Sequence, residues 1–491
     1  MKKSLISTRD PNNSSDFLSA VLQGIAQDGG LYIPSDFSNR QIDLNSLSCD
    51  YLDVAEKVLG ALIDDLDRES LHRILHQAYD GRFACDNIVR LSALGEDHLL
   101  ELYHGPTAAF KDIALSLLPY LMSCASAKQK HPYKSLILTA TSGDTGKAAL
   151  EGFKNTPGCE LVVFYPDHLV SAVQQHQMVS SEGNNVHVCA IRGNFDDAQT
   201  AVKQCFNDPQ LKKDLLEKGY RMSSANSINI GRLVPQIVYY FVAYMTLLKE
   251  NRISQGQKID FVVPTGNFGD ILAGYYAKQM GLPVGKLIIA SNANNVLTDF
   301  FSSGIYDRNR QLKKTTSPSM DILVSSNLER LLSHCSDQDG KQVREWMQQL
   351  NSTGRYQVSD TILKKLQEDF EWGDCNDVQA DQAMHEVWTK YHRIIDPHTA
   401  TAVHAASRFS HNPKVILSTA SPFKFSEDVL KACFSIEEKE EWKAMEMLSR
   451  LSGEPIIGSL CHLREKPVLH TDCIDKDRIK EYIRDLMEVK E

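Results

Sequence analysis

The sequence lacks the features that mark several classes of protein. Its 491 residues carry a formal net charge of −10, with 53 lysines and arginines against 63 aspartates and glutamates, so a basic field for nucleic acid or an anionic membrane is missing. Its 11 cysteines form no C-x-x-C pair and no tight Cys/His cluster, and an H-E-x-x-H motif does not occur. We therefore expect free thiols, no metal site, and neither nucleic acid nor a membrane as a partner.

Long apolar runs are also missing. The N-terminus, MKKSLISTRDPNNSSDF, reaches polar residues before it has built the apolar core of a secretory signal. The most apolar stretch, 233–248, is too short to span a bilayer comfortably, and it contains Pro235 and Gln236. We interpret it as a buried helix with Pro235 near its first turn, and we expect a cytoplasmic protein.

What the chain does contain is a regular alternation of apolar strands and helices. The length predicts two to four domains, and 42% of the residues are hydrophobic, which is ample for a buried core. Short strands that alternate with helices predict βαβ units and parallel sheets. The strands fall into two groups along the chain, which fits two α/β sheets better than one. The predicted strands are 135–140, 161–166, 186–191, 258–266, 286–292 and 414–420.

The order of these segments predicts four parts. The helical, charge-rich start reads as a small N-terminal domain, and the two groups of strands read as a smaller and a larger α/β domain. The larger one carries a polar, mostly helical insertion at 300–395, and the tail reads as a helical extension. The predicted parts are residues 1–95, 96–230, 231–426 and 427–491.

Two glycine-containing turns, TATSGDTGKAAL and VVPTGNFGDILAG, each follow a strand and open a helix. A helix N-terminus offers free N–H groups and a positive dipole end, so each turn is a candidate phosphate or carboxylate site. A tight βα turn without a ligand is the alternative. The first turn is not a Walker loop, because Thr141 and Ala148 stand where glycine and Ser/Thr are required. Neither turn has the dinucleotide pattern G-x-G-x-x-G.

One lysine, Lys111, lies in HGPTAAFKD at 104–112, behind a Gly-Pro turn and next to Phe110. A lysine that is desolvated or placed near other charges becomes a nucleophile and forms Schiff bases with aldehydes. Taken alone, it fits a solvated lysine in a first helical turn better. Together with two anion-binding turns on α/β sheets, it points to pyridoxal phosphate, which needs a lysine, a phosphate site and a polar partner for its ring nitrogen.

Several motifs resemble those of threonine synthase in its longer bacterial and fungal type. They occur in the order found in that family, from about residue 5 to residue 426, and several are six or more residues long. The motifs are LQGIAQDGGLYIP, HGPTAAFKD, LTATSGDTG, SSANSINIGRLVPQ, VPTGNFGDILAGYYAKQMGLP, DPHTA and LSTASPFKF.

The resemblance implies a fold-type-II pyridoxal-phosphate enzyme, similar in fold to the tryptophan synthase β chain. It also implies the last reaction of threonine biosynthesis, in which O-phosphohomoserine and water give L-threonine and phosphate through an aldimine of the cofactor. Lys111 would be the Schiff-base lysine and the catalytic base. The implied partner is this small substrate, and we expect a monomer or a simple homodimer.

The resemblance also implies roles for individual residues. Thr419 would hydrogen-bond the pyridine nitrogen of the cofactor, and Asp144 would lie near its phenolic oxygen. Helix capping is the alternative role for the hydroxyl groups of the first turn. Residues implied to hold the cofactor phosphate are Gly266, Asn267, Phe268, Gly269 and Asp270. Residues implied to bind substrate are Thr141, Ser142, Gly143, Thr145, Lys147 and Arg232.

One motif departs from the family pattern. We expect STAHPAKF and find STASPFKF, so Ser421 replaces a histidine and Phe423 replaces a small residue. This leaves open a threonine-synthase-like phospho-lyase, which would release 2-oxobutyrate, ammonia and phosphate from O-phosphohomoserine or phosphothreonine. A non-catalytic relative that acts as a binding protein is the alternative from another class, although the presence of Lys111 and Thr419 argues against it.

Overall fold

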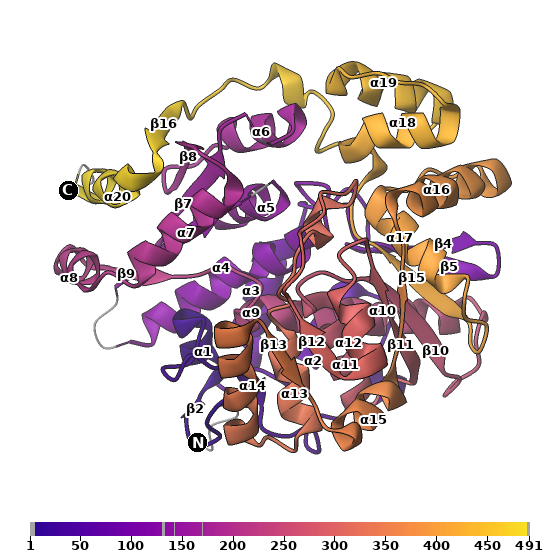
Figure 1. Cartoon of the computed structure of the whole chain (residues 1–491), viewed down its shortest axis with the longest axis horizontal. Helices are drawn as coiled ribbons and strands as arrows, with labels where there is room; N and C mark the ends of the chain where they lie inside the picture. The colour runs from indigo at the N-terminus through magenta and orange to yellow at the C-terminus, as the bar shows by residue number, and fades with distance from the viewer. Residues whose placement is uncertain (1–4, 130–132, 142, 169, 489–491) are drawn as a thin grey trace.

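Two α/β sheets organise the chain in the computed structural model, which describes residues 5–129, 133–141, 143–168 and 170–488 (Figure 1). All six strands predicted from apolar runs are present in these sheets. Each strand has apolar residues on both faces because helices cover both faces, which is why it reads as a continuous apolar run rather than as an alternating one.

The larger sheet has six strands and is parallel except at one edge, where β4 pairs antiparallel with β5. Phe261 and Val263 pack with α10 (Ile237–Lys249) and α11 (Gly269–Gln279), and Val262 between them packs with α17 (Pro397–Ala406) on the opposite side. Its strands, in spatial order, are β14 (Phe370–Asp374), β11 (Val284–Ser291), β10 (Ile259–Pro264), β15 (Lys414–Ser418), β5 (Asp97–Glu101) and β4 (Arg90–Leu94).

The smaller sheet has five strands, all parallel. Helices α5 (Asp144–Phe153) and α7 (Phe195–Phe206) cover its opposite faces. The end of the chain completes one edge: in Figure 1 the yellow strand β16 lies beside the magenta strand β8. Its strands, in spatial order, are β16 (Asp472–Asp475), β8 (Val186–Arg192), β7 (Cys159–Pro166), β6 (Lys134–Ala140) and β9 (Tyr220–Ser223).

The N-terminal residues form an antiparallel sheet and three helices, of which α1 and α3 pack on α4 (Lys111–Ala127) and α2 packs on α3 and α10. The Tyr79 hydroxyl, at the end of α3, donates a 2.8 Å hydrogen bond to the Ile113 carbonyl oxygen in α4. This contact anchors the helix that begins at Lys111. The N-terminal elements are β1 (Leu5–Ser7), β2 (Ser14–Ser15), β3 (Tyr32–Pro34), α1 (Phe17–Gln23), α2 (Tyr51–Gly60) and α3 (Arg68–Tyr79).

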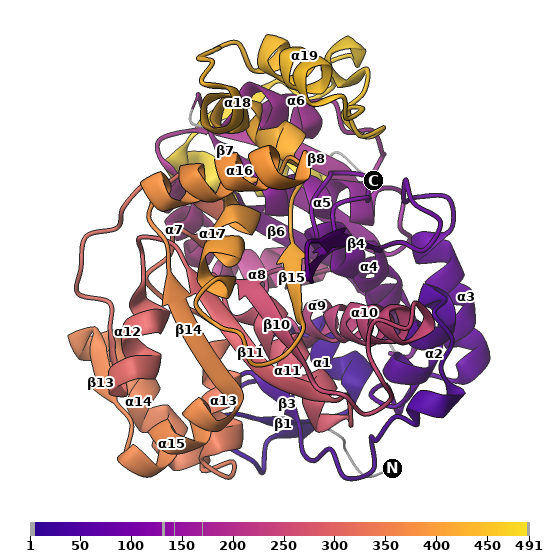
Figure 2. The same ribbon diagram turned by 90° about the vertical axis from the view of Figure 1, so that its right-hand side faces the viewer.

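The remaining helices fill the space around both sheets, and Figure 2 shows α18 and α19 stacked above α16. In the described ranges, none of the helices combines the length and the apolar character needed to cross a bilayer. The helices not yet given are α6 (Ala172–Val179), α8 (Pro209–Glu217), α9 (Ile230–Leu233), α12 (Val296–Ser303), α13 (Leu328–Cys335), α14 (Gly340–Thr353), α15 (Asp360–Asp369), α16 (Asp377–Tyr391), α18 (Ser426–Phe434), α19 (Glu441–Ser452) and α20 (Ile479–Glu488).

All three predicted boundaries separate strands that pair with each other. The strand β5, placed in the part 96–230, pairs with β15 of the part 231–426 in the larger sheet. A boundary after residue 95 separates β4 from β5, although these strands pair with each other at the edge of the larger sheet. The segment 427–491 is not helical throughout, because β16 joins the smaller sheet. The insertion at 300–395 likewise supplies β14 to the larger sheet and the antiparallel pair of β12 (Ile305–Asp307) and β13 (Arg355–Gln357).

Candidate active site

The turn before α4 holds Lys111 beside the end of β15. The Phe110 N–H donates a 2.9 Å hydrogen bond to the Thr419 carbonyl oxygen, and the Ser421 N–H donates a 3.1 Å bond to the Ala108 carbonyl oxygen. Ala108 takes a left-handed conformation with a φ of 58°, which costs a non-glycine residue about 1–2 kcal/mol. Two segments that are far apart in sequence thus run antiparallel, and they bring Lys111 and Thr419 together.

Asp112, the next residue in α4, braces the same turn. Its carboxylate accepts hydrogen bonds of 2.8 Å from the Thr107 N–H and 2.6 Å from the Thr107 hydroxyl. Burial raises the pKa of this carboxyl to about 6, although the bonds from Thr107 oppose the rise. The motif at 104–112 therefore carries its own support for the loop that leads to Lys111.

The Lys111 ammonium group lies among polar groups from distant parts of the chain. Its Nζ is 3.5 Å from Asp144 Oδ2, donates to Ser319 Oγ at 3.2 Å, and lies 5.5 Å from the centre of the ring that precedes it. Burial lowers the pKa of this amine. The Asp144 charge opposes that fall, whereas the Lys424 and Arg232 charges add to it. A larger neutral share at a given pH makes Lys111 a better nucleophile and base.

Asp144, the first residue of α5, gathers three lysines. Its Oδ1 lies 2.5 Å from Lys424 Nζ and 3.3 Å from Lys147 Nζ, while its Oδ2 faces Lys111. Gln174 of α6 donates a further bond of 3.1 Å to Oδ1. Burial alone would raise the pKa of this carboxyl, but the surrounding ammonium groups hold it well below its usual value. Asp144 therefore stays ionised and organises the site.

The cluster contains more cationic groups than carboxylates. Lys147 is fully buried, and burial together with the Lys424 charge lowers its pKa well below the usual value. Arg232 is also buried; one of its nitrogens donates to the Ala225 carbonyl oxygen at 2.9 Å, and its Nε has no partner among the described residues. Burial lowers the pKa of Arg232 to about 10. An anion bound here would relieve both the repulsion and the unpaired donor.

The second glycine turn forms the start of α11. Phe268 caps the helix in a left-handed conformation with a φ of 64°, and the first turn leaves N–H groups without helical acceptors. A Cβ at Gly266 would lie 3.0 Å from the Ser319 carbonyl oxygen, so the backbone approaches closely here. Because Ser319 also contacts Lys111, this turn lies close to the amine. These features, with the excess positive charge, fit the phosphate group of pyridoxal phosphate.

The side chains of that turn do not all face the same way. Asp270 accepts hydrogen bonds from the Tyr239 and Tyr240 hydroxyls, so its carboxylate turns towards α10. Its contribution to a phosphate site would be its backbone N–H. Asn267 is exposed, and its side-chain oxygen accepts a 3.2 Å bond from the Ser326 hydroxyl. Gly269 begins the helix, as the sequence predicts.

Thr419 has a hydroxyl available for a ligand. Its backbone is committed to Phe110, but the hydroxyl has no hydrogen-bond partner within the described part of the chain, and the residue is buried. A neutral hydroxyl at this place suits a pyridine nitrogen, as the resemblance implies.

The first glycine turn supports itself through Thr141. The Thr141 hydroxyl accepts bonds of 3.0 Å from both the Gly143 and the Gly146 N–H groups, so it caps the start of α5. Gly143 has a φ of 149°, and a Cβ there would lie 2.3 Å from Gln174 Oε1. Thr145 is half-buried, and the predicted role of Ser142 lies outside the described residues.

Sequence reasoning missed several residues of the site. Ser319 lies in the polar insertion, and its N–H donates to His398 Nε2 at 3.3 Å. His398 is buried, and its Nδ1 pairs with the Asp396 carboxylate at 2.7 Å. This chain of contacts positions Ser319 against Lys111. The DPHTA motif contained the signal for His398, whereas Ser319 follows only from the tertiary fold.

The two departures from the family pattern lie beside this site. The Ser421 hydroxyl accepts a 3.4 Å bond from the Phe423 N–H and so caps the short 3₁₀ helix η4 (Pro422–Phe425). The Phe423 ring is buried in a hydrophobic cluster that includes Ala108 and Val173. Lys424, between the two phenylalanines of η4, reaches Asp144.

Three family profiles match consecutive parts of the chain. The profile described as "Pyridoxal-phosphate dependent enzyme" matches residues 88–420, which is more than half of the chain. "Threonine synthase N terminus" matches residues 4–79, and "Threonine synthase, C-terminal" matches residues 399–455.

Whole-chain comparisons agree with these matches. A threonine synthase of Pseudomonas aeruginosa is 40% identical over 434 residues, which cover 87% of this chain and 90% of that protein. The human protein "Threonine synthase-like 1" is 37% identical over 487 residues and 95% of this chain, but the chain spans only 63% of that protein's length. The structure of a PLP-bound threonine synthase from Brucella melitensis superposes with a TM-score of 0.89, at 36% identity and 99% coverage of both chains.

Proposed function

This chain belongs to the threonine synthase family of pyridoxal-phosphate-dependent enzymes, and we propose that it converts O-phosphohomoserine and water to L-threonine and phosphate. The observation that carries the proposal is the Lys111 amine, held against Asp144 within an excess of buried cationic groups. Such a site suits a substrate that carries both an amine-bearing carbon and a phosphate.

The cofactor, when bound, supplies an electron sink that makes the carbon next to the substrate amine acidic. The chain must supply a base at that carbon. Lys111 Nζ is our candidate, since burial and the neighbouring cations favour its neutral form. The Ser319 hydroxyl and the Asp144 carboxylate orient this amine by accepting hydrogen bonds from it.

Two different groups would hold the two phosphates. We propose that the backbone N–H groups of 267–270 hold the cofactor phosphate at the start of α11. Arg232 and Lys147 would hold the substrate phosphate, since both are buried and Arg232 Nε has no partner among the described residues. The N–H groups of 143–146 that Thr141 leaves free would take the substrate carboxylate.

Product analysis tests the proposal directly. Purified protein is supplied with pyridoxal phosphate and O-phosphohomoserine, and threonine, 2-oxobutyrate and phosphate are followed together. We expect threonine to appear in step with phosphate. Phosphate with 2-oxobutyrate in place of threonine would identify a phospho-lyase, an outcome that the Ser421 and Phe423 departures make worth testing. If neither threonine nor 2-oxobutyrate is formed, both the synthase and the phospho-lyase reaction are rejected.

Compartment and assembly are further proposals. None of the eleven cysteines, all within the described ranges, forms a disulfide, which supports a reducing compartment such as the cytoplasm. We propose a monomer or a simple homodimer, which analytical ultracentrifugation of the cofactor-loaded protein would distinguish from larger assemblies.

A further inference from the structure

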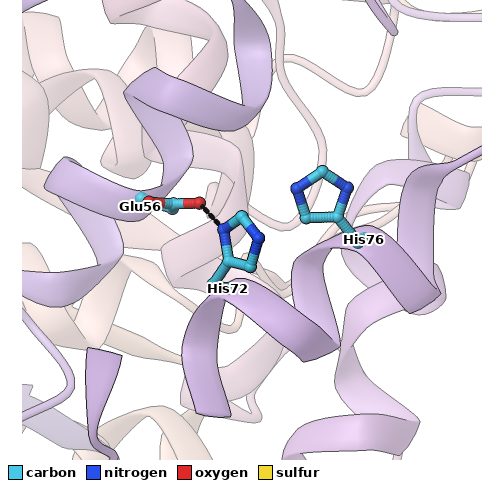
Figure 3. Close-up of side chains that lie close together, drawn as sticks. All are labelled: Glu56, His72 and His76. Atoms are coloured by element: carbon cyan, nitrogen blue, oxygen red, sulfur yellow. Dashed lines mark hydrogen bonds and ion pairs between the residues drawn. The ribbon is translucent and has the colours of Figure 1, made fainter. Parts of the chain in front are cut away.

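Three potential metal ligands meet on the surface of the N-terminal domain, on helices α2 and α3. Glu56 lies on α2, and His72 and His76 lie on α3 (Figure 3). One ligand atom from each residue lies within 4.8 Å of the other two. Figure 3 shows the two imidazole rings side by side, with the Glu56 carboxylate reaching His72 from the neighbouring helix.

Helix geometry explains the juxtaposition. His72 and His76 are four residues apart, so both project from one face of α3, and their ring centres are 4.4 Å apart. The apolar faces of α2 and α3 are buried in the same core, which includes Val58 and Leu75 and fixes the two helices against each other. The carboxylate and the imidazoles therefore come together on rigid elements rather than on loops.

A fourth residue orients one of the ligands. His76 Nδ1 lies 2.9 Å from Asp80 Oδ2, one turn further along α3. Histidines that bind metals commonly donate their other ring N–H to a carboxylate, which fixes the tautomer and the ring orientation. Bonding of Nδ1 to Asp80 leaves Nε2 of His76 with its lone pair available, on the edge of the ring that Figure 3 shows turned towards His72.

We propose that Glu56, His72 and His76 bind a divalent transition metal, with Zn²⁺ as the best match. A donor set of two imidazoles and one carboxylate suits Zn²⁺, Co²⁺ or Ni²⁺, whereas Mg²⁺ and Ca²⁺ prefer all-oxygen sites. Small side-chain rotations bring three ligands around one ion, and water completes a tetrahedral shell. The spacing H-x-x-x-H at 72–76 is the signal for this metal site in the sequence, and our expectation of no metal site did not take it into account.

The site lies on the helix that supports the catalytic helix. Tyr79, at the end of α3, bonds to the Ile113 carbonyl oxygen of α4, and α4 begins at Lys111. A metal that joins α2 to α3 would stabilise this support without contacting the substrate. The role we infer is structural, so the metal would raise thermal stability with the logarithm of its free concentration above the Kd and would leave the chemical step unchanged.

Spectroscopy of the full-length, tag-free, cofactor-loaded protein tests the proposal. After treatment with EDTA, Co²⁺ is titrated at a pH above the ordinary imidazole pKa, and Zn²⁺ affinity is measured by competition with a chromophoric chelator. We expect one equivalent of Co²⁺ with the d–d absorption of a tetrahedral nitrogen and oxygen site. A thiolate charge-transfer band would instead indicate binding at a cysteine such as Cys461, and would overturn the assignment.

Matched variants locate the site. His76→Gln should abolish the single equivalent, and Asp80→Asn should weaken Zn²⁺ binding by about 10–100-fold. The control is His462→Gln, which alters another exposed histidine paired with a carboxylate and should change nothing. Zn²⁺ should raise the melting temperature of the native and control proteins, raise that of Asp80→Asn less, and leave that of His76→Gln unchanged. Equal Zn²⁺ affinity and stoichiometry in the native protein and in His76→Gln would reject the site.

Discussion

Asp144 and Lys424 form a buried ion pair between segments that adjoin the two α/β sheets. Asp144 begins α5 against the smaller sheet, and Lys424 follows β15 of the larger sheet. Their oxygen and nitrogen atoms are 2.5 Å apart, and Lys424 has no exposed side-chain surface. The same carboxylate faces Lys111, so this contact between the regions of the two sheets also sets the charge around the Lys111 amine.

Replacing Asp144 with asparagine should therefore destabilise the protein. The substitution leaves buried lysines without their carboxylate, and breaking a buried pair from one side costs about 3–5 kcal/mol. Chemical denaturation of the cofactor-free protein measures the change. Asp475→Asn removes the exposed partner of Arg192 and should cost less than about 0.5 kcal/mol. A similar small loss for both variants would contradict the central role of Asp144.

The charge of Asp144 should also control the reactivity of Lys111. Asp144 raises the pKa of the Lys111 amine and Lys424 lowers it. Asp144→Asn should therefore move the pKa of Lys111 down, and Lys424→Met should move it up. The pH dependence of Lys111 labelling by an amine reagent, mapped by mass spectrometry in the cofactor-free protein, reads both shifts. Shifts of the same sign in the two variants would show that another group dominates.

Lys111→Ala should abolish turnover. The substitution removes the base and the covalent attachment point, and we expect activity to fall by more than about 10³-fold. Borohydride reduction of the holoenzyme should fix the cofactor on the peptide containing Lys111 in the native protein and on no peptide in the variant. Lys128→Ala, an exposed lysine at the other end of α4, is the matched control and should retain activity. Retention of activity by Lys111→Ala would remove the basis of the proposed mechanism.

Much of the fold could be predicted from the sequence, because buried parallel strands carry a strong apolar signal. The runs at 161–166 and 258–266 correspond to β7 and β10. Two of the missed strands show why their signals were weaker. The strand β14 reads FEWGD within a polar region, and β16 reads DCID at an exposed edge with one neighbour. Pairing with strands that are distant in the sequence supplies what these short segments lack.

Some residues of the candidate site could likewise be predicted from the sequence, and others could not. Lys111 and the turn at 266–270 lie in local motifs whose chemistry can be read from adjacent residues. Ser319 and Gln174 could not be predicted, since they reach the site from the short 3₁₀ helix η3 (Pro318–Met320) and from α6, which carry no motif of their own. Asp270 shows the converse: its motif suggests a ligand, but the tyrosines of α10 capture its side chain.

Asp270 should make stability depend on pH. Burial raises its pKa to about 6, against an ordinary 3.8, and the tyrosine bonds only partly oppose this. The folded state therefore favours the protonated carboxyl. The stabilisation is fully present below the ordinary pKa and is lost as pH rises through about 6, a change of at most about 3 kcal/mol.

Asp270→Asn removes this titration. The native protein should lose unfolding free energy relative to the variant as pH rises from about 4 to about 6. Denaturant titrations at several pH values measure both proteins, and Asp475→Asn serves as the exposed control. Parallel curves for the native protein and Asp270→Asn across this range would show that Asp270 is not protonated in the fold.

Phe423, which stands where the family pattern has a small residue, has two testable effects, one on stability and one on which product is formed. Its ring is 4% exposed within a cluster that includes Ala108 and Val173, so Phe423→Ala should cost about 3–5 kcal/mol through the cavity that it leaves. Phe434→Ala, at a half-buried ring against the same cluster, should cost less.

Product analysis of the same variants decides what else the ring does. Ala108 precedes the turn to Lys111, so loss of the ring loosens the support of the amine as well as the core. The conservative Phe423→Leu keeps most of the volume and should fold, which separates the two effects. A raised ratio of 2-oxobutyrate to threonine in Phe423→Leu at unchanged stability would assign the ring to control of water addition. An unchanged ratio, together with a large loss of stability in Phe423→Ala, would make it a core residue alone.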